Sequence, residues 1–499
     1  MSTTSDLILA LQHHALAFPE HSAIETLLGE KISYGALQTE IDRLSAAFSP
    51  FRGQAIAINI DHCLSWLLAD LAALKCGVVT VPLPPFFTTE QKQNALLKSR
   101  CVAVLTDQTP SVHVAGKQRV AIGTIKLNMV MLDANTVSSP LHLGTAKVTF
   151  TSGSTAAPKG VCLSAPQMCS VAKSIAGIRK SFGWERHLVT LPLPVLLENV
   201  AGVYATLMAG HTIVVPDAYS NFTTVLQGPD YDRICQAIST SGAHSIIAVP
   251  EMLRGLLNAQ SIMKADHSKL QFVAVGGSRV SEALLDQARA QGWPVYQGYG
   301  LSEAGSVTTL NLPGQSGAGS VGQALPHAEI EIGSDREIYL KQPGFLGYCG
   351  EPSIDPDLFP TGDLGHIDHE GFVYIDGRKK NVLITSEGRN ICPEWPESLL
   401  LSQPCILQAF AFETGTADIG ALVVIRADAR DAEITAAIAQ SNSQLPPYAQ
   451  INFWRKVPAF TPQNRMLTGN GRLRRQAIRD AHLTQTPAPK PKREVVACN

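Results

Sequence analysis

The segment 148–160, Val-Thr-Phe-Thr-Ser-Gly-Ser-Thr-Ala-Ala-Pro-Lys-Gly, is the part of the chain best suited to hold an anion. An apolar strand leads into a loop dense in serine, threonine and glycine, with one lysine, Lys159. Small residues let backbone N–H groups approach an anion, hydroxyls donate further hydrogen bonds, and the lysine adds a point charge. The order Pro158-Lys159-Gly160 differs from that of a Walker A loop. The pattern predicts a phosphate-binding loop of another kind, with a polar surface turn as the alternative.

The glycine-rich segment 297–303, Gln-Gly-Tyr-Gly-Leu-Ser-Glu, ends on a carboxylate that could hold a metal ion. Magnesium takes hard oxygen ligands and usually keeps several waters, so Glu303 and phosphate oxygens would suffice. The alternative is an acidic residue at the start of a helix. No third glycine follows Gly298 and Gly300 at the spacing of a dinucleotide fingerprint, and segment 469–471 fails the same test. A nicotinamide-dependent oxidoreductase therefore receives little support.

Two further turns have residues that suit a nucleoside. Asp363 follows a Thr-Gly pair, where its carboxylate could accept hydrogen bonds from both hydroxyls of a ribose. An Asx turn is the alternative there. The Gly-Gly-Ser turn at 276–278 closes an apolar strand and would let the backbone lie against a flat base, although an ordinary tight turn has the same composition.

Composition excludes several classes of protein. Forty Lys and Arg against 42 Asp and Glu residues leave a net charge of −2, whereas proteins that bind nucleic acid or anionic membranes are usually more basic. Ten cysteines without a Cys-x-x-Cys pair favour a reduced, cytoplasmic protein over a zinc site or a disulfide framework. The apolar segment 65–82 is interrupted by Asp70 and Lys75, so it predicts a buried helix followed by a buried strand and no membrane span. The first residues lack the basic region of a secretory signal.

Alternating helices and strands must position these turns. Residues 34–47 read as an amphipathic helix capped by Ser33, residues 55–60 as a strand, and residues 64–75 as a helix. Further short apolar strands are predicted at 77–81, 245–249, 272–275 and 294–296. Runs of this kind are typical of parallel strands that are covered by helices on both faces. The predicted fold class is therefore α/β.

The pattern of hydrophobic residues in the sequence changes after about residue 314. Alternating segments at 329–332 and 337–340 predict an antiparallel hairpin. We expect a large N-terminal domain with parallel-rich sheets covered by helices, over residues 1–379, and a small mobile C-terminal α+β domain, over residues 380–483. The proline-containing segment 484–499 is predicted to be a disordered tail.

Five motifs together resemble those of the AMP-forming adenylating superfamily, which includes acyl-CoA synthetases, peptide-synthetase adenylation domains and luciferases. In the family's order they are the phosphate loop at 148–160, the adenine, phosphate and magnesium loop at 297–303, the ribose turn at 361–363, the hinge at 377–380, and the loop at 467–472, which in the family carries the catalytic lysine. The resemblance covers almost the whole chain and is closest to a stand-alone acyl-CoA or acyl-carrier-protein ligase.

The resemblance implies that Mg·ATP and a carboxylic acid form an acyl-adenylate, whose acyl group a thiol then accepts. The residues that would bind ATP or AMP are Thr151, Ser152, Gly153, Ser154, Thr155, Lys159, Gly276, Gly277, Ser278, Gly298, Tyr299, Gly300, Ser302, Asp363, Ile375 and Arg378. Glu303 would hold Mg²⁺, and Arg472 would contact the reacting oxygens. The small domain would then turn about Lys380, so that Gly388 lets a pantetheine arm pass.

The chain departs from the family pattern at three positions. Ala156 replaces a glycine, and Ser302 replaces a threonine but keeps the hydroxyl. Arg472 stands where the family has the catalytic lysine, and a planar guanidinium does not substitute conservatively for an ammonium group. Three outcomes are open: Arg472 does the lysine's job with altered geometry, adenylation is slow, or the protein retains only thioester transfer or binding. We favour the first, because the other ATP-site motifs are nearly intact; an impaired homologue that binds ATP or acyl-AMP is the alternative.

The segment 191–202 lies where the family builds its acid pocket. It is mostly apolar, which favours a fatty or aryl acid over a charged amino acid. The candidate pocket residues are Pro194, Asn199, Val200 and Gly202. Only the short tail follows the small domain, so the thiol is expected from coenzyme A or from the phosphopantetheine of a free acyl carrier protein.

Overall fold

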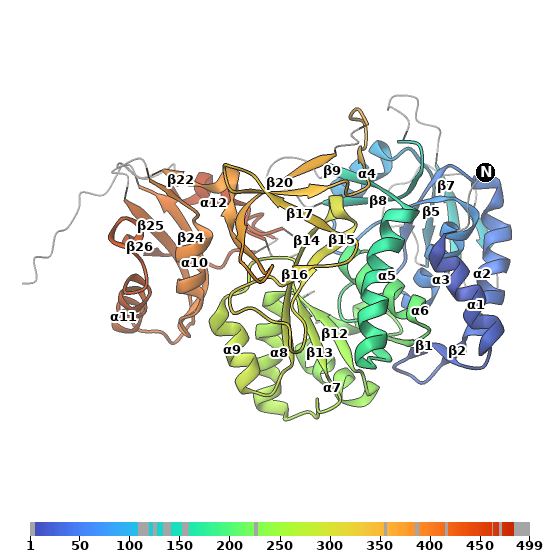
Figure 1. The fold of residues 1–499 in the computed structure, drawn as a ribbon, viewed down its shortest axis with the longest axis horizontal. Helices are drawn as coiled ribbons and strands as arrows, with labels where there is room; N and C mark the ends of the chain where they lie inside the picture. The colour runs from blue at the N-terminus through green and yellow to red at the C-terminus, as the bar shows by residue number, and fades with distance from the viewer. Residues whose placement is uncertain are drawn as a thin grey trace, which may run out of the picture. The chain divides into compact units, whose positions relative to one another are not determined.

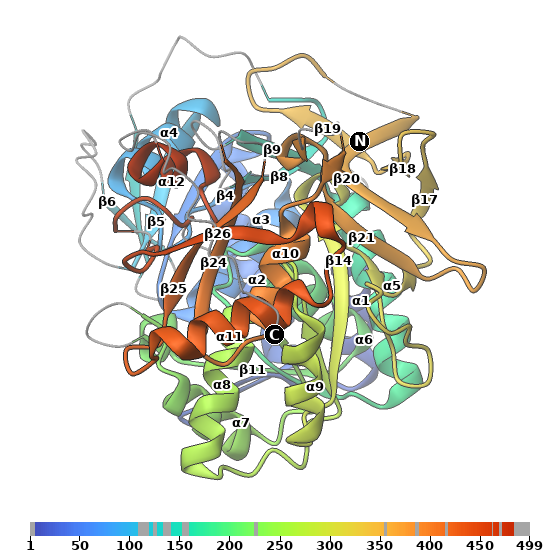
Figure 2. The same ribbon diagram turned by 90° about the vertical axis from the view of Figure 1, so that its left-hand side faces the viewer.

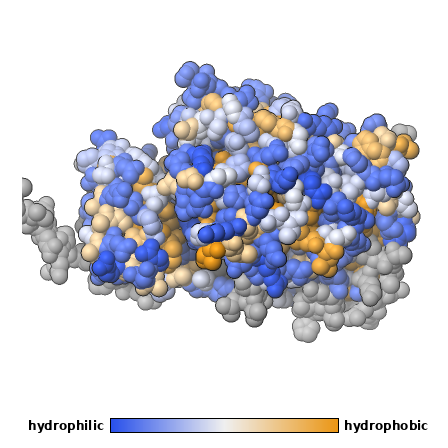
Figure 3. Space-filling model, turned by 90° about the horizontal axis from the view of Figure 1, so that it is seen from below, coloured by the Kyte–Doolittle hydropathy of each residue, from blue (hydrophilic) through white to orange (hydrophobic). Residues whose placement is uncertain are grey.

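The computed structural model of the chain describes residues 5–107, 119–122, 127–132, 141–151, 159–223, 228–353, 357–384, 389–414, 418–461, 463–468 and 472–483. They form two compact units, which divide between Ile375 and Asp376 (Figure 1). Among these residues, no helix is both long and apolar enough to cross a membrane. The face of the molecule in Figure 3 is mostly hydrophilic, with apolar residues in small separate patches.

The first unit contains a nine-stranded sheet with the order β16-β15-β14-β13-β12-β10-β11-β1-β2. Its strands are β1 (Ser22–Thr26), β2 (Lys31–Ser33), β10 (Arg186–Leu188), β11 (Thr212–Val215), β12 (Ser245–Ala248), β13 (Phe272–Val275), β14 (Val295–Leu301), β15 (Ser306–Leu310) and β16 (Gln323–Ala324). The strands from β1 to β14 in this order pair in parallel, whereas β14 and β15 form an antiparallel hairpin. Helices α7 (Tyr231–Ser241), α8 (Pro250–Met263) and α9 (Glu282–Ala290) lie beside β12, β13 and β14 (Figure 1).

The second large sheet of this unit has the order β19-β9-β8-β4-β3-β5-β7-β6. Its strands are β3 (Ala55–Asn59), β4 (Val79–Pro82), β5 (Cys101–Thr106), β6 (Arg119–Ile122), β7 (Leu127–Met131), β8 (Thr145–Thr151), β9 (Lys159–Ser164) and β19 (Phe345–Tyr348). Strands β3, β4, β5 and β8 are parallel where they pair, and β8 and β9 form an antiparallel hairpin. The predicted α/β class is confirmed.

A layer of helices lies between these two sheets. Its members are α1 (Asp6–Ala17), α2 (Tyr34–Phe48), α3 (Cys63–Cys76), α5 (Ala165–Phe182), α6 (Ala205–Ala209) and the π-helix η2 (Leu197–Tyr204). Helix α5 contacts β15 of one sheet and β8 and β9 of the other. The predicted cap of α2 is confirmed, because the Ser33 hydroxyl accepts a hydrogen bond from the Ala36 N–H at 3.3 Å. The predicted helix and strand over 64–81 are also confirmed, as α3 and β4.

The remaining elements of the first unit are short or peripheral. Helix α4 (Thr89–Lys98) has a capping box at Thr88, and two 3₁₀ turns cover Ser49–Phe51 and Tyr219–Phe222. A third 3₁₀ turn, η4 (Ser302–Ala304), follows β14 directly. A four-stranded sheet has the order β17-β18-β20-β21, from β17 (Glu329–Ile332), β18 (Glu337–Lys341), β20 (Leu358–Ile367) and β21 (Val373–Arg378). The predicted hairpin is confirmed as β17 and β18, which pair antiparallel.

The second unit is a small α+β structure, whose main elements are labelled in Figure 2. Its elements are η5 (Lys379–Asn381), β22 (Leu383–Ile384), β23 (Asn390–Ile391), α10 (Glu394–Leu401), β24 (Ile406–Glu413), β25 (Ile419–Ile425), α11 (Asp431–Asn442), η6 (Pro447–Ala449), β26 (Ile451–Lys456) and α12 (Arg475–His482). Strands β24, β25 and β26 form one sheet, and α10 and α11 pack their apolar residues against it. This unit therefore has its own core.

Candidate active site

The β8–β9 hairpin carries the predicted phosphate loop. Thr151 is the last residue of β8, and its backbone pairs with that of Lys159, the first residue of β9. The two strands thus bring the ends of the loop together. Four predicted phosphate-binding residues within the loop lie outside the described residues: Ser152, Gly153, Ser154 and Thr155.

Lys159 and Glu303, predicted separately to bind phosphate and magnesium, meet at one tyrosine. The Lys159 ammonium lies 4.4 Å above the centre of the Tyr348 ring and 3.1 Å from a carboxylate oxygen of Glu351. The Tyr348 hydroxyl donates a hydrogen bond to Glu303 Oε1 at 2.8 Å. Burial, and the Glu303 charge next to it, raise the pKa of Tyr348, so its hydroxyl stays a donor. The arrangement places a cation and a carboxylate at one site.

Glycines give the loop around Glu303 its shape. A Cβ on Gly300 would lie 1.9 Å from the carbonyl oxygen of Ser306, so only glycine fits in this tight β14–β15 hairpin. Gly305 closes the following 3₁₀ turn with a φ of +77°, which glycine adopts without strain. The side-chain amide of Gln167, at the start of α5, donates to the carbonyl oxygens of Glu303 and Pro343 at 2.7 Å each. Three segments are thus tied together behind the carboxylate.

The donor set around Glu303 suits magnesium better than a transition metal. Among the described residues, no group of three or more His, Cys, Asp or Glu side chains could hold a metal ion alone. Glu303 is only partly buried and presents one hard carboxylate, with Oε1 oriented by Tyr348. An ion held there would need most of its ligands from phosphate and water, which is the usual coordination of Mg²⁺ in nucleotide sites.

The predicted adenine and ribose residues come together in the first unit. Strands β13 and β14 are parallel neighbours, and a Cβ on Gly276 would lie 3.2 Å from the carbonyl oxygen of Gly298. The Tyr299 hydroxyl donates to Asp363 Oδ2 at 2.8 Å. Ile375 packs in the same small apolar cluster as the Tyr299 ring. Of the remaining predicted residues, Gly277 has a φ of +83° at the exposed end of this turn, and Ser278 is partly buried beside it.

Asp363 is held rigidly within β20. It is buried, and its backbone N–H donates to the Thr361 hydroxyl at 3.1 Å. That hydroxyl donates in turn to the carbonyl oxygen of Ile338 at 2.7 Å. The intervening Gly362 donates its N–H to the buried carboxylate of Glu337 at 3.0 Å. The neighbouring strand β18 therefore fixes the turn that presents the Asp363 carboxylate, which is predicted to bind a ribose, and no sequence motif indicated either β18 residue.

Other predicted site residues belong to the second unit. Arg378 ends β21, and Lys380 lies exposed in η5. Arg472 pairs with Thr468: its N–H donates to the Thr468 hydroxyl at 2.9 Å, and its carbonyl oxygen accepts from the Thr468 N–H at 2.8 Å. The predicted thioester residue Gly388 lies outside the described residues.

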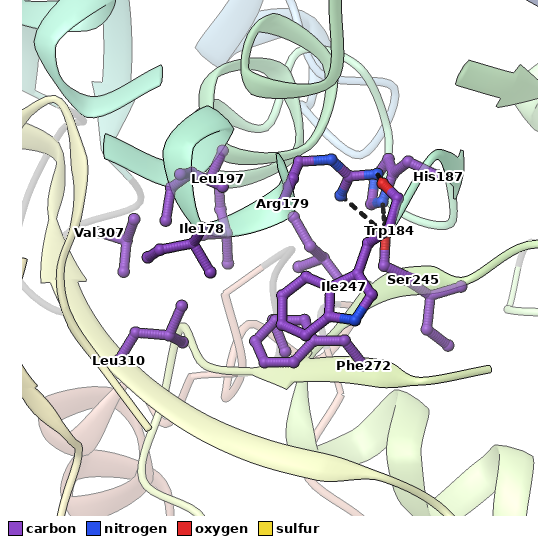
Figure 4. Close-up of a pocket in the computed structure, with 14 residues that line it drawn as sticks. Ile178, Arg179, Trp184, His187, Leu197, Ser245, Ile247, Phe272, Val307 and Leu310 are labelled. Carbon is purple, nitrogen blue, oxygen red and sulfur yellow. Dashed lines mark hydrogen bonds between the residues drawn. The ribbon is translucent and has the colours of Figure 1, made fainter. Parts of the chain in front are cut away.

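An apolar cavity of about 40 Å³ lies between α5, η2 and the strands β12, β13 and β15 (Figure 4). Leu197 and Ala201 line it from the π-helix, and Trp184 and Phe272 stack at its wall with ring centres 4.2 Å apart. Its other apolar lining residues are Ile175, Ile178, Ile246, Ile247, Ala274, Val307 and Leu310. The residues predicted to contact the acid, Pro194, Asn199, Val200 and Gly202, are not among them. From the segment 191–202, in which the acid pocket was predicted, Leu197 and Ala201 line this cavity instead.

A chain of buried polar groups borders this cavity (Figure 4). Arg179 donates to the Ser245 hydroxyl at 2.8 Å, and His187 Nδ1 lies 3.0 Å from the same hydroxyl. His187 Nε2 lies 2.7 Å from the Glu198 carboxylate. Burial lowers the pKa of His187 despite this carboxylate, so the ring is neutral. A Cβ on Gly202 would lie 2.3 Å from Glu198 Oε1, so this glycine leaves room for the pair.

The chain is similar to known proteins along most of its length. The model of the family described as AMP-binding enzyme matches residues 11–348. The 2-succinylbenzoate–CoA ligase of Bacillus cytotoxicus is 28% identical over 431 residues, which cover 80% of this chain and 84% of that protein. The long-chain-fatty-acid–CoA ligase FadD15 of Mycobacterium bovis is 25% identical over 519 residues, covering 85% and 86%. The structure of o-succinylbenzoate CoA synthetase (MenE) from Bacillus subtilis with the acyl-adenylate OSB-AMP aligns with a TM-score of 0.77 at 23% identity, over 98% of this chain and 100% of that chain, and so shares the fold.

Proposed function

The chain belongs to the AMP-binding enzyme family, and from this membership we propose that it is an AMP-forming acid–CoA ligase. The observation that carries the proposal is the convergence of Lys159, Tyr348 and Glu303, with the Tyr299–Asp363 pair in the same unit. Such a site offers a cation for phosphate, a carboxylate for a metal and a buried carboxylate for a ribose. Both named CoA ligases among its relatives match along most of their length.

In the first half-reaction, a carboxylate attacks the α-phosphate of ATP and pyrophosphate leaves. Lys159 and the hydroxyls of the β8–β9 loop hold the β- and γ-phosphates, and Asp363 and Arg378 hold the ribose. A Mg²⁺ ion bound at Glu303 would neutralise charge on the phosphates. Arg472 stabilises the charge that develops on the reacting oxygens. Catalysis on this scheme is positioning and electrostatic stabilisation, without a covalent enzyme intermediate.

The acid places its apolar part in the cavity between α5 and η2. The lining is aliphatic and aromatic, which suits a fatty or aryl acid. The cavity is small, at about 40 Å³. We therefore expect compact apolar acids to be used in preference to long-chain acids.

In the second half-reaction, a thiol attacks the acyl-adenylate and AMP leaves. The small domain turns about Lys380, a change that a few hinge residues can absorb. Gly388, which has no side chain, lets the pantetheine arm pass. Coenzyme A is the proposed acceptor, since the named relatives are CoA ligases, and the phosphopantetheine of a free acyl carrier protein is the second candidate. We place the reaction in the cytoplasm, where coenzyme A and ATP are both present.

The test is acid-dependent release of pyrophosphate from Mg·ATP, measured over a panel of aryl acids and fatty acids of increasing length. Release with a compact apolar acid, followed by acyl-CoA formation when coenzyme A is added, supports the proposal. Supply of a phosphopantetheinylated carrier protein in place of coenzyme A separates the two acceptors. If no acid releases pyrophosphate from the wild-type protein but the Arg472→Lys variant does so, the chain is an adenylation-impaired homologue.

A further inference from the structure

A buried ion pair in the first unit joins helix α3 to the strand before the phosphate loop, and both of its members form hydrogen bonds with the π-helix beside the acid cavity. The Lys147 ammonium, on β8, lies 2.8 Å from the Asp70 carboxylate, on α3. Their side chains are 2% and 1% exposed. In the sequence, Asp70 interrupts an apolar run, and Lys147 lies in the strand that leads to Thr151. No motif of the predicted active site includes either residue.

Every donor of this ammonium group has a partner. Besides Asp70, Lys147 donates to the side-chain oxygen of Asn199 and to the Tyr204 hydroxyl, the latter at 3.1 Å. Asp70 also accepts from the Asn199 amide at 3.1 Å, from the Tyr204 hydroxyl at 2.6 Å and from the Thr80 hydroxyl at 3.2 Å. Replacing a buried ion pair by apolar residues often leaves the free energy of unfolding unchanged or raises it. A contribution to stability therefore does not explain why Lys147 and Asp70 are present.

Asn199 and Tyr204 can share these partners because their helix has π geometry. They are five positions apart, which in an α-helix, at about 100° per residue, would direct them about 140° away from each other. At the end of η2 the Ala205 N–H donates to the carbonyl oxygens of Gly202 and Val200, and the bond to Val200, five residues earlier, is the one typical of a π-helix. Both side chains therefore reach Asp70 and Lys147, while Leu197 and Ala201 line the cavity.

We propose that Asp70 and Lys147 are positioning residues for the acid pocket, which hold residues 197–204 as a π-helix through Asn199 and Tyr204. The pair thereby determines which residues of this segment face the acid. Without it, the segment would relax toward an α-helix and turn Leu197 and Ala201 away from the cavity. Neither charged group touches the substrate. The assignment of the cavity to the acid rests on the proposed function, whereas the control of helix geometry does not.

Two single-hydroxyl variants separate this role from general stability. Tyr204→Phe and Thr80→Val each remove one hydrogen bond to Asp70, but only the first removes a tie to the π-helix. We expect amide hydrogen exchange within residues 197–204 to become about tenfold faster or more in Tyr204→Phe and to stay within about twofold of wild type in Thr80→Val. Equal effects of the two variants, or none, on this exchange would overturn the proposal.

The kinetic test uses the acid of the panel that gives the fastest pyrophosphate release. We expect the KM for the acid to rise about tenfold in Tyr204→Phe, with the KM for ATP within about twofold of wild type and an altered rank order among the acids. A Lys147→Met/Asp70→Leu double variant, which removes both charges, should show the same split while remaining folded. Equal changes in both KM values would indicate a structural role only and overturn the proposal. If no acid supports turnover in the wild-type protein, the proposed function fails. The hydrogen-exchange comparison then still decides whether the Asp70–Lys147 pair controls the helix geometry.

Discussion

At the level of single residues, Tyr348 organises the site. Its ring lies under the Lys159 ammonium, and its hydroxyl orients the Glu303 carboxylate, so it joins a group proposed for phosphate to one proposed for metal. Lys159 is 54% exposed on its side chain and Glu351 45%, so their ion pair is weak and a phosphate can displace it. The site is thus assembled but open to a ligand.

Replacing Glu303 tests the metal assignment. Glu303→Gln keeps the size of the side chain and an acceptor for Tyr348 but removes the charge that holds Mg²⁺. Pyrophosphate release should fall by about a hundredfold or more, with a higher Mg²⁺ requirement. Tyr348→Phe, which removes only the orienting hydroxyl, should cause a several-fold loss. Titration of activity against Mg²⁺ in the three proteins checks this, and an unchanged Mg²⁺ requirement in Glu303→Gln would refute the assignment.

Arg472 is the residue proposed to stabilise the reacting oxygens in the first half-reaction. Its charge is permanent near neutral pH, and its backbone N–H donates to the Thr468 hydroxyl. Arg472→Ala should slow adenylation by about 10²–10³, while a supplied acyl-adenylate is still converted to the thioester. Arg472→Lys should retain or increase adenylation. Single-turnover assays of the two half-reactions measure this, and full adenylation in Arg472→Ala would show that another group supplies the cation.

At the level of secondary-structure elements, the π-helix η2 borders two environments. Leu197 and Ala201 line the apolar cavity, while Glu198 accepts the backbone N–H groups of Thr190 and Leu191 at 3.2 and 2.9 Å and lies next to His187. Gly202 makes the close approach of Glu198 possible. A short segment can combine these contacts because its wider turn changes which residues share a face.

A pair of glycine substitutions tests this packing. A methyl group at Gly202 would meet Glu198 and His187 at 2.3 and 2.7 Å, so Gly202→Ala should destabilise the first unit by about 1–3 kcal/mol. Gly177 is exposed within α5, and a methyl group added there would have no atom within 4 Å, so Gly177→Ala should stabilise the unit by about 0.5–1 kcal/mol. Chemical denaturation of both variants gives the comparison. A neutral Gly202→Ala would mean that the Glu198–His187 pair can move aside at little cost.

At the level of the whole molecule, the proposed site residues are distributed over two units with separate cores. The first has the Lys159–Tyr348–Glu303 and Tyr299–Asp363 groups, and the second has Lys380 and Arg472. Within the second unit, Arg475 makes a two-pronged ion pair with buried Glu397 at 2.6 and 2.9 Å, which fixes α12 just after Arg472. Separate cores let each unit remain folded while the linking residues change conformation, as the proposed hinge requires.

Acid should destabilise the first unit through its buried and half-buried histidines. Burial is the largest cause that lowers the pKa of five of them, His14, His187, His211, His244 and His327, and it lowers that of His211 to about 4. Well above pH 6.5 these groups are neutral in both the folded and the unfolded state. As the pH falls from about 6.5 to 4, the unfolded chain binds protons that the folded unit does not, so stability is lost. The melting temperature should therefore be lower at pH 5 than at pH 7.5, by less in His211→Gln; equal melting temperatures would contradict this.

Local sequence patterns were enough to predict the α/β class, the Ser33 cap, the helix and strand over 64–81 and the β17–β18 hairpin, because periodicity and turn chemistry specify such elements. They also led to the prediction of Lys159, Glu303 and Asp363 as ligand-binding residues, since each lies in a short segment of distinctive composition. Only the folded chain showed which residues connect them. Tyr348 has no motif, and Asp70 was only a break in an apolar run, yet each acquires its role from residues far away in the chain. The π-helix that directs Asn199 toward Asp70 and Lys147, and Leu197 toward the cavity, depends on contacts between α3, β8 and η2, and such distant contacts leave no local pattern.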